Sequence, residues 1–354
     1  MKRQAMLAVA TMFSLSFGVS FSVDLPGEPF LSKNRAKPLF REKALVTFRC
    51  SLGKPEHYAR SVRSLILFNE LKGGVQLQPD RQSKVGIKLS THFAPGLATS
   101  RPLVDALLDL LKARGFASES VFLLDLETRG LRRAGFLPPR SKGGNRYRGH
   151  PVVALDSRTY FDERWFHDSP MPPTTDYRAR LSLRYPRDRE VRLREERRSY
   201  LPAPLFLEDA FWINLPVAID SRSLGIDAAV GNASLHAVDN NSRFLGRSTT
   251  APSAATEILA IPEYWEKHLF SILDLSRFQY AGGSKFDAQF LGGEPTLMLS
   301  ENPLSVDYFA MGALSKARTA EGFDLRDREK APLFRFGEDL GLARKGEARL
   351  VDLP

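Results

Sequence analysis

The sequence predicts an α/β protein: a mainly parallel sheet with helices on both faces and an inserted Arg-rich β-hairpin. Three patterns favour this class. A strand, a helix and a second strand follow one another between residues 85 and 126, and such a unit forms a parallel strand pair with a right-handed crossover. A short apolar strand at 211–213 breaks into a long polar loop, and a later strand at 296–299 leads into another helix.

The first 22 residues have the pattern of a signal peptide. Lys2 and Arg3 precede an apolar run, and Ser20-Phe21-Ser22 places small residues where a signal peptidase cuts. We therefore expect cleavage near Ser22 and a secreted or periplasmic protein. The alternative is an anchor formed by an uncleaved N-terminal helix, because the run is about 17 residues long and a spanning helix needs roughly 17–25.

An extended lead-in, 23–56, is expected before a single α/β domain at 57–330. The first elements of this domain, in order, are a helix at His57–Leu71, a strand at Val85–Leu89, a helix at Leu103–Lys112 and a strand at Val121–Leu126. Ser100 is the expected N-cap of the second helix, and Gly115 is expected to end it. A basic loop, 138–150, precedes a short strand at Val152–Leu155.

The clearest strand signal lies at 177–185, where apolar and polar residues alternate. A turn at 186–188 leads back into 191–194, which predicts a β-hairpin inserted at about 177–195. Its polar face carries Arg178, Arg180, Arg184, Arg192 and Arg194. This face is expected either to contact anions or the envelope surface, or to be a solvated face with cross-strand ion pairs.

The last part of the chain is expected to begin with a helix at Ala254–Leu275 that breaks near Pro262. A strand at Thr296–Leu299 and a helix at Val306–Lys316 follow, and residues 331–354 are expected to form a peripheral tail.

Composition limits the partners and cofactors. The single cysteine, Cys50, excludes an internal disulfide and the Cys-ligated iron–sulfur clusters and zinc sites of known pattern. A cysteine-poor exported chain is typical of the bacterial envelope. Without Lys2 and Arg3, 49 of the 51 basic residues stand against 41 acidic ones, and this net charge of +8 favours an anionic ligand. Nucleic acid does not fit an exported protein.

A site is expected where the strands end, because a parallel sheet positions the loops that follow its strands. The most polar of these loops is 214–243. Candidate ligand-binding residues are Lys88, His92, Asp125, Asn214, Arg222, Asn232 and Arg243, and candidate catalytic residues are Lys88, Asp220, His236 and Asp307. Lys88 is expected to hold an anion, Asp220 or His236 to transfer protons, and Asp307 to orient a partner group.

Each candidate has a structural alternative. Lys88 can be a solvated lysine at the rim of the sheet, His92 a hydrogen-bonded loop histidine, and Asp125 the cap of a turn. Asp307 lies near the start of a predicted helix and stabilises that positive end in any case. The carboxylates and amides of 220–240 are turn formers rather than metal ligands in the favoured interpretation, because neither an EF-hand spacing nor a His-x-x-x-His pair is present.

Three segments resemble the family called domain of unknown function 362, over about residues 85–314. They are Val85-Gly86-Ile87-Lys88-Leu89-Ser90, Ile213-Asn214-Leu215-Pro216 and Glu301-Asn302-Pro303-Leu304-Ser305-Val306-Asp307. The first resembles the family's first strand, which usually ends in lysine, one further residue and asparagine. The second is similar to its central strand and turn, and the third to its late loop.

The chain departs from the family pattern mainly at the central motif. Ser221 stands where a histidine is expected, Asp227 where a threonine is expected, and Gly231-Asn232 where a lysine–asparagine pair is expected; Ser90 replaces the asparagine of the first segment. The ferredoxin-type modules of some family members are absent, so no iron–sulfur cluster is expected. If the family's activity depends on the missing side chains, this protein does something different or has lost it.

Two functions stay open. One is the binding of a small anionic ligand at the carboxyl ends of the strands without catalysis, which the missing histidine and lysine favour. The alternative is an enzyme that acts on a small anionic substrate by acid/base chemistry, with or without a metal, which the polar residues of 214–243 favour. In both cases Lys88, Asp125, Asn214 and Asp307 are expected near the same edge of the sheet.

Overall fold

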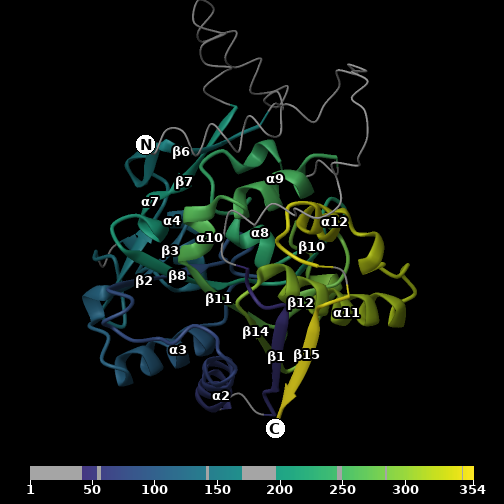
Figure 1. Ribbon diagram of the computed structural model, residues 1–354, viewed down its shortest axis with the longest axis horizontal. Coiled ribbons are helices and arrows are strands. Elements are labelled where there is room, and N and C mark those ends of the chain that lie inside the picture. Colours follow the sequence, from purple (N-terminus) through teal and green to yellow (C-terminus); the bar gives the residue numbers. More distant parts are fainter. Residues whose placement is uncertain are drawn as a thin grey trace, which may run out of the picture. The chain divides into compact units, whose positions relative to one another are not determined.

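A nine-stranded mixed sheet lies at the centre of the computed structural model, which describes residues 42–53, 57–140, 143–169, 197–244, 249–283, 285–344 and 346–354. Its strands, in order across the sheet, are β15 (Arg349–Leu353), β1 (Val46–Ser51), β14 (Thr296–Ser300), β11 (His268–Asp274), β8 (Ala210–Leu215), β2 (Lys84–Leu89), β3 (Val121–Asp125), β5 (His150–Ala154) and β4 (Arg146–Tyr147). In Figure 1, β1 (purple) and β15 (yellow) lie side by side, although they come from opposite ends of the described chain.

Five neighbouring strands, from β11 to β5 across the sheet, are parallel. Strand β14 is antiparallel to both of its neighbours, and β4 is antiparallel to β5. Four of these five strands, β2, β3, β8 and β11, are mostly apolar and buried over most of their length, and β11 is buried at every residue. Such near-continuous burial is typical of strands inside a parallel sheet. The prediction of an α/β protein with a mainly parallel sheet is therefore confirmed.

The strand–helix–strand unit predicted from the sequence consists of β2, α3 (Arg101–Ala113) and β3. Ser100 stands at the N-cap in an extended conformation, and Pro102 lies in the first turn, where its missing N–H costs no helical hydrogen bond. Gly115 follows the helix with a φ of +91°, a left-handed conformation that glycine adopts without strain.

Further elements surround this sheet. The helices are α2 (Tyr58–Leu71), α4 (Thr128–Ala134), α7 (Ala203–Phe206), α8 (Ala229–Ala233), α9 (Ala251–Leu259), α10 (Pro262–Lys267), α11 (Pro303–Ala320) and α12 (Pro332–Asp339). The remaining strands are β6 (Phe161–Asp168), β7 (Arg198–Pro202), β9 (Ile219–Ser221), β10 (Gly225–Asp227), β12 (Phe278–Gln279) and β13 (Leu291–Gly292). Strands β10, β9, β12 and β13 form a second sheet, and β6 pairs with β7.

Three hydrophobic clusters hold the helices against the strands. The first joins α2 and α3 to β2, β3 and β8 and includes Ile213. The second joins α9 and α10 to β3 and β8 and includes Trp212, whose ring stacks on that of Tyr264 with centroids 4.8 Å apart. The third joins α11 to β11 and β14. Trp212 and Ile213 belong to different clusters because successive residues of a strand point to opposite faces of the sheet.

The helix predicted at 254–275 is wrong in its second half. Helix α9 ends at Leu259, α10 covers Pro262–Lys267, and the remaining residues form β11 in the middle of the sheet. The physical reason is that a short, fully buried strand and a buried helix are both apolar on all sides, so periodicity does not separate them.

The sheet also extends beyond the predicted domain boundaries of 57 and 330. Strand β1 lies within the segment expected as an extended lead-in, and the segment 331–354, expected as a peripheral tail, contains α12 and β15. Pairing between strands so far apart in the sequence leaves no local pattern. The predicted signal peptide, 1–22, and the predicted hairpin at about 177–195 lie outside the described residues. Among the helices of the described part of the chain, none has the length and apolar character needed to cross a membrane.

Candidate functional site

Lys88 lies at the centre of a buried polar network at the carboxyl ends of β2, β3 and β8. It stands opposite Asn214 in the register of the two strands, and its side chain is completely buried. Its Nζ atom donates to Asp125 Oδ1 at 2.7 Å, to the Leu89 carbonyl at 2.8 Å and to Asn232 Oδ1 at 3.1 Å. An ammonium group has three N–H donors, so all of them are occupied within the protein.

Asp125 balances the charge of Lys88. Its Oδ2 atom accepts from the backbone N–H of Thr91 at 2.7 Å and from the Thr91 hydroxyl at 2.6 Å. Burial would raise the pKa of Asp125, but the adjacent Lys88 ammonium and these hydrogen bonds outweigh it and lower the pKa below its usual range. Gly130 of α4 makes this contact possible, because a Cβ there would collide with the side chain and carbonyl of Thr91.

Asn214 and Asn232 extend the network across the sheet. Asn232 Nδ2 donates to Asn214 Oδ1 at 2.7 Å, and Asn214 Nδ2 donates to the Ala229 carbonyl at 2.9 Å and to Ser271 Oγ at 3.1 Å. Because these amide groups bond to one another and to the backbone, they hold α8 against the ends of β2 and β8.

Asp307 contacts the start of α8 instead of the start of its own helix. Its two carboxyl oxygens accept from the backbone N–H groups of Ala229 at 2.6 Å and Val230 at 2.9 Å. It lies beyond the first turn of α11, so the expectation that it stabilises the start of that helix is wrong; Asn302 is the N-cap there. Complete burial raises the pKa of Asp307 to about 8, although both backbone donors favour the ionised form.

His236 and Asp227 form a second polar unit beside this network. His236 Nε2 lies 2.8 Å from Asp227 Oδ2, while the buried Nδ1 atom has no hydrogen-bond partner among the described residues. Burial would lower the pKa of His236, but the Asp227 carboxylate outweighs it, and the pKa is raised. Gly231 is required by this arrangement, because a Cβ at that position would collide with Asp227 Oδ1.

A small cavity joins the two units. It is lined by Ser90, Thr91, His92, Asp125, Leu126, Glu127, Asn232 and His236. Its volume of about 10 Å³ is close to the smallest that accommodates one water molecule. The ring centroids of His92 and His236 are 5.5 Å apart. Partial desolvation and the neighbouring His236 lower the pKa of His92.

The structure therefore brings together His92, Asp125, Asn232 and His236 around one cavity, with Lys88, Asn214 and Asp307 behind them. These residues come from β2, β3, β8, the segment around α8 and α11. Among the described residues, no three His, Cys, Asp or Glu side chains are placed to share a metal ion.

Three predicted site residues belong neither to this cavity nor to the network around Lys88. Asp220 forms ion pairs with Arg318 at 3.1 Å and Arg326 at 2.8 Å, which occupy both of its oxygens. The side chain of Arg222 is exposed. Arg243 is buried and donates to the Ser169 carbonyl at 3.4 Å. The ion pairs of Asp220 connect β9 to α11 and to the segment that follows α11. They give Asp220 a structural role and not one in acid/base chemistry.

Sequence reasoning missed the residue that binds Nε2 of His236. Asp227 entered only as one of several polar side chains in the loop. The signal that was available is local: Asp227 and His236 flank Gly231, and a glycine inside a helical segment usually marks a close approach. The contribution of Thr91 depends on a contact with Asp125, 34 residues away, for which there is no local signal.

Comparisons of the chain with protein-family models, with curated proteins and with solved structures find no match.

Proposed function

We propose that the protein is an enzyme that transfers protons to or from a small anionic substrate at the carboxyl ends of β2, β3 and β8. The environment of His236 carries this proposal. Asp227 holds Nε2, the buried Nδ1 has no hydrogen-bond partner among the described residues, and the ring lines the cavity. A buried polar atom without a partner costs free energy, and a catalytic role is one reason for a protein to keep one.

Asp227 determines which nitrogen of His236 can act as a base. A carboxylate only accepts hydrogen bonds, so Nε2 of the neutral ring carries the proton and the lone pair stays on Nδ1. No hydroxyl or thiol in the described part of the chain bonds to Nδ1. The histidine therefore does not activate a nucleophile of the protein there, and direct proton transfer with the substrate or a water is the chemistry that fits.

The network around Lys88 has a supporting role in this proposal. Its three N–H donors already bind Asp125, Asn232 and a backbone carbonyl. An anion would have to displace one of these partners, so binding without catalysis at Lys88 has less support than proton transfer at His236. Lys88 instead fixes Asp125 and Asn232, which line the cavity beside the histidine.

Hydrogen exchange tests the proposal before a substrate is known. Small phosphorylated and carboxylated carbonyl compounds are incubated with the protein in D₂O, and loss of their acidic C–H signals is followed by proton NMR. We expect catalysed exchange with at least one compound, a loss of about 10²-fold or more in His236→Gln, and no change in His57→Gln. Exchange that survives in His236→Gln would rule out this base.

The pH dependence of that exchange provides a second check. The base must be neutral, so the rate is expected to rise with pH through the raised pKa of His236. In Asp227→Asn this rise in rate should occur at lower pH, because the loss of the neighbouring negative charge lowers the pKa of His236. If the rate rises over the same pH range in the variant and in the wild type, the base is another group.

We also propose that the protein is exported and shares its fold with the family domain of unknown function 362. In support, the first two segments of the resemblance lie in the paired strands β2 and β8, and Asp307 of the third bonds to α8. On this proposal, the clusters of α2 with α3 and of α9 with α10 are the helical layers on the two faces of the sheet. Mass spectrometry of protein from a Gram-negative periplasm checks export: a start near Val23 is expected, and an intact Met1 would contradict it.

A further inference from the structure

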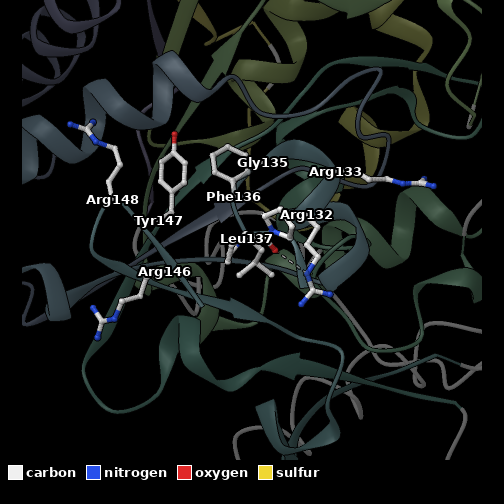
Figure 2. A pocket seen from close by; sticks show the side chains of 10 residues that line it. Arg132, Arg133, Gly135, Phe136, Leu137, Arg146, Tyr147 and Arg148 are labelled. Atoms are coloured by element: carbon white, nitrogen blue, oxygen red, sulfur yellow. Dashed lines mark hydrogen bonds between the residues drawn. The ribbon is translucent and has the colours of Figure 1, made fainter. Parts of the chain in front are cut away.

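Two hollows lined by arginines lie beside α4, next to the cavity of His236. The first, which we call the arginine hollow, has a volume of about 490 Å³ and is lined by Glu127, Thr128, Arg129, Arg132, Arg133, Arg140 and Asp156. The second measures about 620 Å³. Figure 2 shows Arg146 and Arg148 on one side of this second hollow and Arg132 and Arg133 on the other.

The arginine hollow carries uncompensated positive charge. Its four arginines face two carboxylates, Glu127 and Asp156, which leaves a charge of +2. Within the described residues, none of these four arginines forms an ion pair. Arg132 and Arg133 also line the second hollow, but its other two arginines are paired: Arg146 with Glu119 at 2.7 Å and Arg148 with Asp109 at 2.9 Å.

The sequence of α4 concentrates this charge on one side of a short helix. Arg129, Arg132 and Arg133 follow an i, i+3, i+4 spacing, which places their side chains next to one another. Like charges at this spacing destabilise a helix. An anion between the guanidinium groups removes that repulsion, so the arrangement is stabilised by a ligand of opposite charge.

The arginine hollow adjoins the cavity of His236. Glu127 lines both of them, and the chain passes from Asp125, in the cavity, to Arg129, in the hollow, within four residues. A substrate whose anionic group lies among the arginines can therefore extend towards His236 past Glu127. The same path accounts for a catalytic cavity that is itself too small for a whole substrate.

We propose that the arginine hollow binds the phosphate monoester group of the substrate on which His236 acts, an inference that rests on the proposed function. A phosphate monoester carries a charge of about −1.5 to −2 at pH 7, which matches the +2 of the hollow. The planar fork of a guanidinium group binds two phosphate oxygens at once. The volume of about 490 Å³ also leaves room for the carbon skeleton next to the phosphate.

Calorimetric titration with phenyl phosphate and with benzenesulfonate at pH 7.5 tests this site. The two probes share a ring and a tetrahedral anion but differ in charge. We expect phenyl phosphate to bind at least about tenfold more tightly, and Arg129→Ala and Arg133→Ala each to raise its dissociation constant about tenfold. Arg63→Ala, an exposed arginine on α2, is the matched control and should leave binding unchanged.

The outcomes separate this inference from the proposed function. If His236→Gln keeps its affinity for phenyl phosphate while the two arginine variants lose it, the phosphate site is supported whatever the exchange assay finds. Equal affinity for both probes, unchanged binding in the arginine variants, or an equal loss in Arg63→Ala would overturn it without touching His236. Binding to vesicles of phosphatidic acid in phosphatidylcholine, with no binding of phenyl phosphate, would assign the arginines to a lipid headgroup and would also overturn it.

Discussion

Asp125 and Asp227 are both acidic residues at the carboxyl ends of strands, and each holds one basic side chain. Asp125 holds Lys88, and every N–H of the lysine has a partner within the protein. Asp227 holds His236, and the second nitrogen of that ring has none among the described residues. A fully satisfied buried pair holds the fold together. On the proposed function, the half-satisfied pair is the one that carries out the chemistry.

Breaking the Asp125 pair should produce the largest effect. Asp125→Ala leaves the fully buried Lys88 without its counter-charge, so we expect a loss of about 3–5 kcal/mol in the free energy of unfolding. Urea denaturation provides the measurement. The control is Glu119→Ala, which breaks an exposed, solvent-screened pair with Arg146 and should leave the free energy of unfolding nearly unchanged. Equal costs for the two variants would remove the structural role of Lys88.

Asp307 is a third buried carboxyl group to compare: two backbone N–H groups contact it, and among the described residues no cation pairs with it. Its pKa is about 8 in the folded protein, above its ordinary value, so the folded state retains a proton that the unfolded chain releases. Stability should therefore fall as the pH rises from about 4 through about 8, by at most about 1.4 kcal/mol per pH unit from this group.

Asp307→Asn removes that titration, so thermal melts of the variant between about pH 6 and pH 7.5 should show a flatter pH dependence than those of the wild type. A slope that is the same in both proteins would mean that Asp307 stays ionised in the fold, held so by its two backbone donors.

Gly231 offers the smallest and most selective change to the pair of Asp227 and His236. Gly231→Ala places a Cβ against Asp227 Oδ1, and we expect a cost of about 1–3 kcal/mol together with a lower pKa of His236 as the carboxylate moves away. NMR titration of the histidine ring measures the pKa. Gly312→Ala in α11 is the control, because the nearest atom to a Cβ there is a terminal nitrogen of Arg328 at 4.0 Å, an ordinary contact, and alanine favours a helix. A His236 pKa that does not change would separate Gly231 from the site.

Local patterns in the sequence predicted the parts of the fold that depend on neighbours along the chain. The helix after Ser100 and the strands around it follow from periodicity and from turn residues. The rule that sites form at the ends of parallel strands also selected Lys88, Asp125, Asn232 and His236, which the structure places together.

What a side chain binds could not be predicted in the same way. Lys88 was expected to hold a ligand, but its charge is taken by Asp125, 37 residues away. Asp220 was expected to transfer protons, but it pairs with Arg326, 106 residues away. The partner of a side chain depends on which distant segments the folded sheet brings into contact. The neighbouring residues in the sequence do not indicate that partner.

The position of β1 between β14 and β15 determines when this fold can be completed. Phe48 of β1 pairs with Leu299 of β14 and with Val351 of β15, so both of its neighbours are synthesised some 250 residues or more after it. At about 5–20 residues per second, the first strand waits roughly 10–60 seconds for them on the ribosome. Until then its backbone N–H and C=O groups form an open edge available to other chains. A chain that stops before Arg349 would leave β1 as the edge strand, so the last few residues decide whether β1 or β15 presents its backbone at that edge.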